Sequence, residues 1–155
     1  MKQIGIIGMG KWGKNLIKEF SNFAEIPICV TSGNQENIKW IQKYFPKTKS
    51  STKINDILND DNIDAVVIAT PIITHYTLIK KALNSGKHVF VEKPMVQTIT
   101  QANDIINIAK RKKLCLFVGH VFLHNQIFKQ IKKINKSELI TDLNFDWRKF
   151  GTFNE

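Results

Sequence analysis

The sequence predicts an α/β fold built on a doubly wound parallel sheet, and three observations support this. Short runs rich in β-branched residues alternate with amphipathic stretches along the chain. The run at residues 65–69, Ala-Val-Val-Ile-Ala, has no polar alternation, as is typical of a central parallel strand that is buried on both faces. A glycine-rich motif directly follows the first apolar run, where a strand would turn into a helix.

The alternation predicts the elements in chain order. Strands are expected at residues 3–7, 27–31, 65–69, 88–92 and 114–118, and helices at residues 13–23, 35–44, 74–85 and 100–112. Residues 50–59 are interpreted as a cap at Ser51-Thr52, followed by apolar residues at helical spacing. This βαβ order predicts a parallel sheet with helices on both faces.

The pattern changes after Gly119. Residues 121–135 are expected to form one helix, and residues 140–149 a strand. A lone helix and a lone strand cannot bury their apolar faces independently. The sequence therefore predicts one domain over residues 1–120, and over residues 121–155 the linking helix and first strand of an incomplete α+β domain. The exposed strand would pair with another copy, which predicts a homo-oligomer formed through this C-terminal sheet.

Composition is that of a soluble globular protein. The chain has 155 residues, 43% hydrophobic and 23% charged. No run approaches the roughly 20 apolar residues that a membrane span needs. The N-terminus lacks the apolar core and cleavage site of a signal peptide, so a cytoplasmic location without membrane contact is expected.

The formal net charge is +10, which first suggests a polyanionic partner. However, the lysines are scattered over the expected helix faces, and the tight cluster at residues 110–113 falls where a helix should end, next to the negative pole of its dipole. We therefore expect no nucleic-acid partner. Cys29 and Cys115 stand in apolar runs without Cys or His neighbours at metal-ligand spacing, which predicts two buried thiols and no metal site.

The glycine motif Gly8-Met9-Gly10-Lys11-Trp12-Gly13 has the context that dinucleotide binding requires, with a strand before it and a helix after it. Gly8 would permit the tight turn, Gly10 the close approach of backbone to a pyrophosphate, and Gly13 the packing of helix on strand. The phosphates would bind the free N–H groups at the start of the helix. We expect all six residues of the motif to border the cofactor.

The end of the second expected strand bears on the choice of cofactor. NAD selectivity usually depends on an acidic residue there, which binds the ribose hydroxyls and repels a 2′-phosphate. This chain has Thr31-Ser32-Gly33-Asn34 instead, and no acid before Glu36. The sequence therefore favours NADP, with NAD possible.

Glu92-Lys93-Pro94 stands at the carboxyl end of the strand expected at residues 88–92. Open α/β sheets bind their ligands at the carboxyl ends of strands. A lysine placed there can transfer a proton or polarise a carbonyl. Taken alone, the tripeptide could equally be a surface turn.

Together these motifs resemble the glucose-fructose oxidoreductase / inositol dehydrogenase (Gfo/Idh/MocA) family. The matching segments are the glycine motif, Ala69-Thr70-Pro71 with His75, Gly86-Lys87-His88-Val89, Glu92-Lys93-Pro94-Met95 and Val118-Gly119-His120. The resemblance implies a Rossmann domain that binds NAD or NADP, followed by a substrate domain of which residues 121–155 would be the start.

The resemblance also implies roles for individual residues. Lys93 matches the catalytic lysine of the family's Glu-Lys-Pro motif, and Glu92 with Lys93 borders the cofactor. Thr70, Pro71 and His75 match a loop beside the cofactor. Family members that share Trp12 and its neighbours oxidise sugar or nucleotide-sugar hydroxyls, so a small sugar-type substrate is expected.

Two other functions remain open at the level of sequence. A non-catalytic NAD(P)-binding sensor or interaction module could keep the fold and lose the chemistry. A nucleic-acid binder would suit the charge, but the sequence has no recognition-helix motif or aromatic stacking platform.

Overall fold

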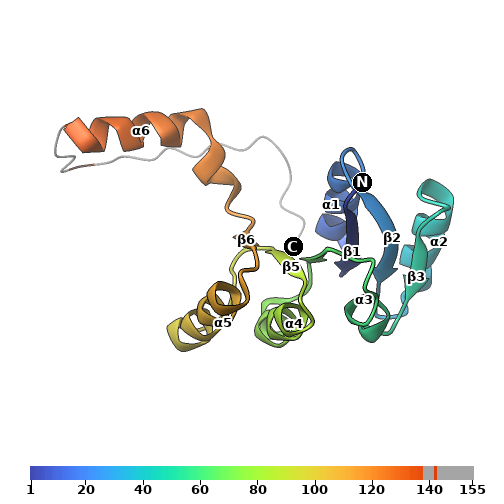
Figure 1. Ribbon diagram of the computed structural model, residues 1–155. Helices are drawn as coiled ribbons and strands as arrows, with labels where there is room; N and C mark the ends of the chain where they lie inside the picture. Colours follow the sequence, from blue (N-terminus) through green and yellow to red (C-terminus); the bar gives the residue numbers. More distant parts are fainter. Residues whose placement is uncertain (138–141, 143–155) are drawn as a thin grey trace. The chain divides into compact units, whose positions relative to one another are not determined.

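The computed structural model describes residues 1–137 and residue 142 (Figure 1). Contacts between Cα atoms divide the chain into two units, Met1–Gly119 and His120–Glu155. Apart from residue 142, the strand expected at residues 140–149 lies outside the described residues, so the second domain stays a prediction. None of the described helices is long and apolar enough to cross a membrane.

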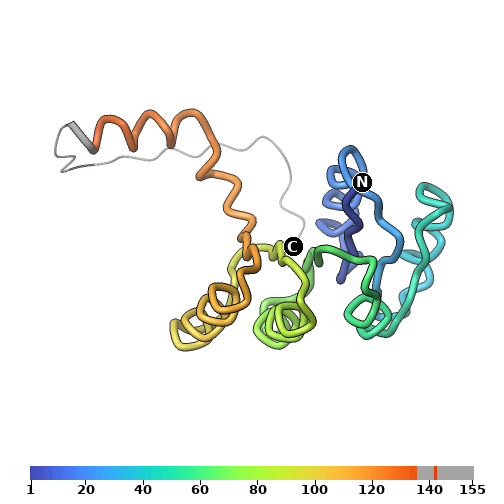
Figure 2. The backbone as a smooth tube through the Cα atoms, in the orientation of Figure 1, coloured from blue at the N-terminus to red at the C-terminus, as the bar shows by residue number. Residues whose placement is uncertain are grey.

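The first unit contains one six-stranded sheet of parallel strands in the order β3-β2-β1-β4-β5-β6. This order confirms the doubly wound parallel sheet. Figure 2 follows the chain from the blue β1 to the orange α6. The strands are β1 (Gln3–Ile7), β2 (Glu25–Val30), β3 (Lys49–Ser51), β4 (Ala65–Ile68), β5 (His88–Val91) and β6 (Leu116–Val118).

Helices connect these strands and cover the sheet. In the first unit they are α1 (Lys11–Phe20), α2 (Gln35–Tyr44), α3 (Asn55–Leu58), α4 (Ile72–Asn84) and α5 (Ile99–Lys112). The described part of the second unit contains a 3-10 helix, η1 (Val121–His124), and α6 (Gln126–Ser137).

Two apolar clusters form the core, one on each face of the sheet. Residues of α3, α4 and α5 pack on one face, where Figure 1 shows these three helices in a row. Residues of α1 and α2 pack on the other face. In β4, Val66 and Ile68 belong to the first cluster and Val67 to the second, and all three are at most 1% exposed. This confirms that β4 is buried on both faces.

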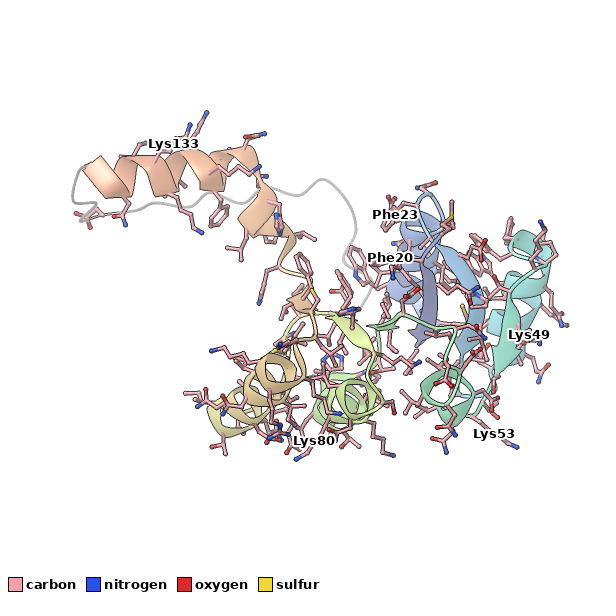
Figure 3. All side chains as sticks on the ribbon, in the orientation of Figure 1. Phe20, Phe23, Lys49, Lys53, Lys80 and Lys133 are labelled. Atoms are coloured by element: carbon pink, nitrogen blue, oxygen red, sulfur yellow. The ribbon has the colours of Figure 1, made fainter. Side chains whose placement is uncertain are left out.

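The second face continues towards β6 as a row of aromatic rings. Phe20 and Phe23 lie side by side at the end of α1 (Figure 3), with ring centroids 5.3 Å apart. Phe20 meets Phe90 of β5 edge to face at 5.4 Å, and Phe90 stacks on Phe117 of β6 at 5.6 Å. Offset and edge-to-face pairs are the arrangements that aromatic rings favour.

The structure corrects the interpretation of residues 50–59 as one capped helix. Residues Lys49–Ser51 form the edge strand β3, and the helix α3 begins only at Asn55. The strand has no apolar run, and its backbone bonds to β2, with Val30 opposite Ser51. Pairing with a neighbouring strand leaves no periodic signal in such a short polar segment.

The helix expected at residues 121–135 is also wrong in part, because it is interrupted at Asn125. The backbone of Asn125 is extended, with φ −68° and ψ 142°, and its side chain accepts a hydrogen bond from the Ile127 N–H at 2.8 Å. Asparagine competes in this way with helical hydrogen bonding. The chain therefore forms η1 before this residue and α6 after it.

One of the two cysteines differs from prediction. Cys29 in β2 is fully buried, and burial raises the pKa of its thiol to about 12. Cys115 is exposed, as is Phe117 two residues later in β6, which is an edge strand of the sheet. Its backbone N–H donates to Nδ1 of His88 at 2.9 Å and its carbonyl accepts from the Val89 N–H at 2.9 Å, so its backbone already pairs with β5.

Candidate functional site

The glycine turn joins β1 to α1 at the carboxyl edge of the sheet. Gly8 has φ +101°, and its N–H donates to the Val30 carbonyl at 2.9 Å. A Cβ atom on Gly8 would overlap the Ala69 carbonyl, and one on Gly13 would overlap the Gly8 carbonyl. Both glycines therefore serve the close packing of turn, helix and strand.

Gly10 differs from these two glycines. A Cβ atom placed on Gly10 would meet nothing within 4 Å, so its backbone borders open space at the start of α1. The first N–H groups of a helix have no partners within the helix. An anionic group can approach them here without a side chain in the way.

A cavity of about 480 Å³ lies beside the glycine turn. It extends across the carboxyl ends of β1, β2 and β4 and reaches the start of α4. Its walls are Ile7, Gly8, Met9, Gly10, Val30, Thr31, Ser32, Asn34, Asn37, Thr52, Ile54, Ala69, Thr70, Pro71, Thr74 and Leu78. We call it the first cavity.

The segment after β2 forms the polar end of the first cavity. Thr31 continues the ladder through a bond from its N–H to the Ser51 carbonyl at 2.9 Å, and Gly33 turns the chain with φ +91°. The Asn34 side chain accepts from the Asn37 N–H at 3.0 Å and so caps α2. Among the described residues, those that line the first cavity include hydroxyls and amides but no acid.

A second cavity of about 290 Å³ is lined by Trp12, Ala69, Thr70, Glu92 and Lys93. The Trp12 indole N–H donates to the buried carboxylate of Glu92 at 2.5 Å, and the Lys93 backbone N–H lies 3.3 Å from its other oxygen. The Lys93 side chain is exposed. Thr70 borders both cavities, so they adjoin at the end of β4.

Gly119, just after β6, makes room for this arrangement. A Cβ atom at that position would lie 3.1 Å from a carboxylate oxygen of Glu92 and 3.2 Å from the Phe90 ring. Both distances are tighter than most real Cβ contacts. The absence of a side chain therefore leaves the Glu92 carboxylate free to meet Trp12.

The fold brings most of the expected site residues together around these two cavities. The first is bordered by Gly8, Met9, Gly10, Thr31, Ser32, Asn34, Thr70 and Pro71, and the second by Trp12, Thr70, Glu92 and Lys93. Four expected residues line neither of the two, namely Lys11, Gly13, Gly33 and His75.

His75 departs most clearly from expectation. Its side chain is 1% exposed, and each ring nitrogen faces a backbone carbonyl, Nε2 that of Thr70 at 2.8 Å and Nδ1 that of Pro94 at 2.9 Å. His75 thus lines neither cavity, and its ring contacts the backbone at Thr70 and at Pro94.

Eight of the sixteen wall residues of the first cavity were not among the expected site residues, and five of these lie outside the strands that the sequence predicts. Thr52 and Ile54 follow β3, and they were not placed because that strand was not recognised. Asn37 lies in the first turn of α2, where its amide could have been noticed beside the Asn34 cap. Thr74 and Leu78 lie one helical turn apart on α4, so their shared face was available from the spacing.

This geometry is that of a dinucleotide-binding Rossmann domain, with a strand, a glycine turn, a helix N-terminus and an adjoining cavity at the carboxyl edge of a parallel sheet. The model of the oxidoreductase family with an NAD-binding Rossmann fold, GFO_IDH_MocA, matches residues 2–120. The chain belongs to this family, which confirms the resemblance to the Gfo/Idh/MocA oxidoreductases.

Individual relatives agree with the family. Glycosyl hydrolase family 109 protein 2 of Shewanella sp. (strain ANA-3) is 31% identical over 77% of this chain and 28% of its own length. The scyllo-inositol 2-dehydrogenase (NADP(+)) IolW of Bacillus subtilis is 28% identical over 92% of this chain and 39% of its own. The solved scyllo-inositol dehydrogenase of Lactobacillus casei with NAD(H) and scyllo-inositol is 25% identical, with a TM-score of 0.79, over 92% of this chain and 43% of that one.

The chain is much shorter than its relatives. It spans 20% to 40% of the length of the curated proteins that it matches. The matched part contains the family's NAD-binding domain.

Proposed function

We propose that this chain is the cofactor-binding part of an NAD(P)-dependent oxidoreductase that acts on the hydroxyl or carbonyl group of a sugar, polyol or nucleotide sugar. The observation that carries the proposal is the pair of adjoining cavities at one edge of the sheet. One contains the glycine turn and the other contains Lys93. Family membership supports both assignments.

The first cavity is proposed to hold the adenosine and phosphate end of the cofactor. The backbone of Gly8, Met9 and Gly10 would face the pyrophosphate, because Gly10 borders open space at the start of α1. Thr31 to Asn34 would face the ribose. Lys11, Gly13 and Gly33 would support the turns between these contacts.

We further propose a preference for NADP over NAD. No acid stands among the described walls of the first cavity to repel a 2′-phosphate, and Ser32, Asn34, Asn37 and Thr52 offer hydroxyl and amide donors there. The relatives include a protein named for NADP(+) and a structure with NAD(H), so both cofactors occur among similar proteins.

The second cavity is proposed to hold the nicotinamide end and the reacting part of the substrate. When bound, the nicotinamide supplies the site for hydride transfer. Lys93 would hold or move a proton at the substrate oxygen, since this residue is exposed and lines the cavity. The Glu92 carboxylate, fixed by the Trp12 indole, would orient the segment that carries Lys93.

A carbohydrate-type substrate is supported by two similar proteins. One is named an inositol dehydrogenase and the other a glycosyl hydrolase, and both names refer to polyhydroxylated molecules. The site chemistry agrees, because a lysine beside a hydride acceptor suits an alcohol that loses a proton from its oxygen.

Titration of the chain with NADPH and with NADH tests cofactor binding. We expect saturable binding, with a Kd for NADPH about tenfold lower than that for NADH. The 2′-phosphate of NADPH would accept hydrogen bonds from the hydroxyl and amide donors of the first cavity, and no acidic side chain would repel it. A tenfold preference for NADH would contradict the NADP assignment. Binding of neither nucleotide would contradict the proposed function.

A Lys93→Met variant of the enzyme that contains this chain tests the catalytic role. Turnover of a sugar or polyol substrate is expected to fall by about 100-fold or more, whereas the Kd for NADPH should change by less than about threefold. Lys47→Met is the control, because that lysine is exposed, lines neither cavity and lies outside the glycine motif. Unchanged turnover in the Lys93 variant would favour the non-catalytic sensor instead.

A further inference from the structure

We propose that His75 is a positioning residue that holds the Lys93 segment against the end of β4 and so sets the shape of the second cavity. The inference rests on the proposed function, because that function assigns the nicotinamide end of the cofactor to this cavity. His75 would act from behind the cavity wall, through its contacts with the backbone, and would not contact the cofactor.

The first argument concerns where the sheet ends. β4 and β5 pair in register as far as Ile68 and Val91, and the last ladder bond runs from the Glu92 N–H to the Ile68 carbonyl at 3.0 Å. Beyond this bond the two segments of the chain diverge. One enters α4 through Thr70 and Pro71, and the other continues as Lys93 and Pro94, and a proline has no N–H to donate.

The His75 ring spans this divergence. Nε2 lies 2.8 Å from the Thr70 carbonyl oxygen and Nδ1 lies 2.9 Å from the Pro94 carbonyl oxygen. One side chain of α4 thus contacts both segments just past the point where the ladder stops. A neutral ring donates to one of the two carbonyls, and a protonated ring donates to both. His75 is 1% exposed, so its ring nitrogens have little access to water.

The two segments that the ring contacts both line the second cavity. Ala69 and Thr70 line it from the β4 side, and Glu92 and Lys93 from the β5 side. Thr70 and Pro94, which the ring joins, belong to the same two segments. A change in the ring would therefore alter the separation of the walls, and with it the direction of Lys93.

Helix capping does not account for this histidine. His75 is the fourth residue of α4, and the side chain of the N-cap residue, Pro71, makes no capping hydrogen bond. The Thr74 hydroxyl already contacts the Pro71 carbonyl at 2.7 Å. The ring nitrogens instead contact the Thr70 and Pro94 carbonyls, one in each of the two wall segments.

The test compares two ligands that differ by the nicotinamide, NADPH and 2′-phospho-ADP-ribose, in the full chain. In His75→Leu we expect the Kd for NADPH to rise about tenfold and that for 2′-phospho-ADP-ribose to rise less than about twofold, since only the second cavity loses its shape. If the wild type prefers NADH, the matched pair is NADH and ADP-ribose.

Two further variants keep the test informative if His75→Leu fails to fold. The amide nitrogen of asparagine corresponds to Nδ1 of histidine, and that of glutamine to Nε2. His75→Asn can therefore keep the Pro94 contact and His75→Gln the Thr70 contact. Because the Pro94 contact holds the segment of Lys93, the Kd ratio of the two ligands should stay nearer the wild-type value in His75→Asn.

Tyr76→Phe is the matched control. Tyr76 follows His75 on α4, its hydroxyl donates to Asp104 at 2.8 Å, and it lines neither cavity. This variant should leave the Kd ratio unchanged. If the two Kd values rose equally in His75→Leu, or did not rise, the positioning role would be overturned. If the wild-type chain bound neither nucleotide, the proposed function would be overturned instead.

Discussion

The two cavities at the carboxyl edge of the sheet are held by different kinds of interaction. The first is built mostly from short segments that turn by themselves, the glycine turn and the Asn34 cap. The second depends on side chains far apart in sequence. Trp12 meets Glu92, and His75 meets Pro94. Substitutions within the turns should therefore disturb the fold around the first cavity. Substitutions at the contacts between residues far apart in sequence should change the shape of the second cavity.

The largest effect is expected at the glycine turn. In Gly13→Ala the new Cβ would overlap the Gly8 carbonyl, and we expect a loss of about 3 kcal/mol in the free energy of unfolding, because backbone cannot move aside as a side chain can. Denaturant titration followed by circular dichroism measures this loss.

Gly10→Ala is its matched partner. The added methyl group meets no protein atom within 4 Å, so stability should fall by less than about 1 kcal/mol. Affinity for NADPH should nevertheless fall by about tenfold, since the methyl occupies the approach to the helix N-terminus. Equal stability losses in the two variants would contradict the different roles of these glycines.

A smaller effect is expected where distant residues meet. Trp12→Phe leaves the buried Glu92 carboxylate one donor short, which should cost about 1–2 kcal/mol of unfolding free energy. The Kd for NADPH should rise relative to that for 2′-phospho-ADP-ribose. Trp40→Phe on α2 is the control, because Trp40 packs on Tyr44 and Phe45 and lines neither cavity. If the ratio of the Kd for NADPH to that for 2′-phospho-ADP-ribose changed equally in both variants, Trp12 would have no special role.

The Asn34 cap should give a still smaller effect. Asn34→Ala removes the acceptor of the Asn37 N–H, at a cost of about 1 kcal/mol. Thr98→Ala removes the same kind of cap from α5, where the Thr98 hydroxyl accepts from the Gln101 N–H at 3.2 Å. Both variants should lose similar stability in thermal unfolding, but only Asn34→Ala should weaken NADPH binding.

The smallest effect is expected outside both cavities, between α4 and α5. Lys80, labelled in Figure 3, donates to Asp104 at 2.9 Å, and the bonds from Lys80 and Tyr76 hold the pKa of the Asp104 carboxyl below its usual range. A carboxyl with a lowered pKa stabilises the fold above its unfolded pKa and loses this contribution as the pH falls through its folded pKa.

Thermal unfolding from about pH 7 down to about pH 2 measures this contribution. Asp104→Asn should have a slightly lower Tm than the wild type at neutral pH, and the difference should vanish in acid. The effect is small because the pair is partly exposed to solvent. Asp61→Asn at an exposed loop position is the control. A Tm difference that persists in acid would show that the charge is not its cause.

The sequence by itself predicted the features that depend on local pattern. Alternating apolar runs indicated the parallel sheet, and the spacing of Gly8, Gly10 and Gly13 located its binding edge. The family resemblance, which the match over residues 2–120 confirms, rested on the same short motifs. Such features can be read from a sequence because neighbouring residues are enough to form them.

Tertiary structure decided the rest. β3 exists because its backbone pairs with β2, Cys115 is exposed because β6 is an edge strand, and His75 is buried because α4 packs on the sheet. Spacing could not reveal the Trp12–Glu92 contact, since those residues are 80 positions apart. Contacts between segments that only the folded sheet brings together have no local signal, and they are the ones that shape the second cavity.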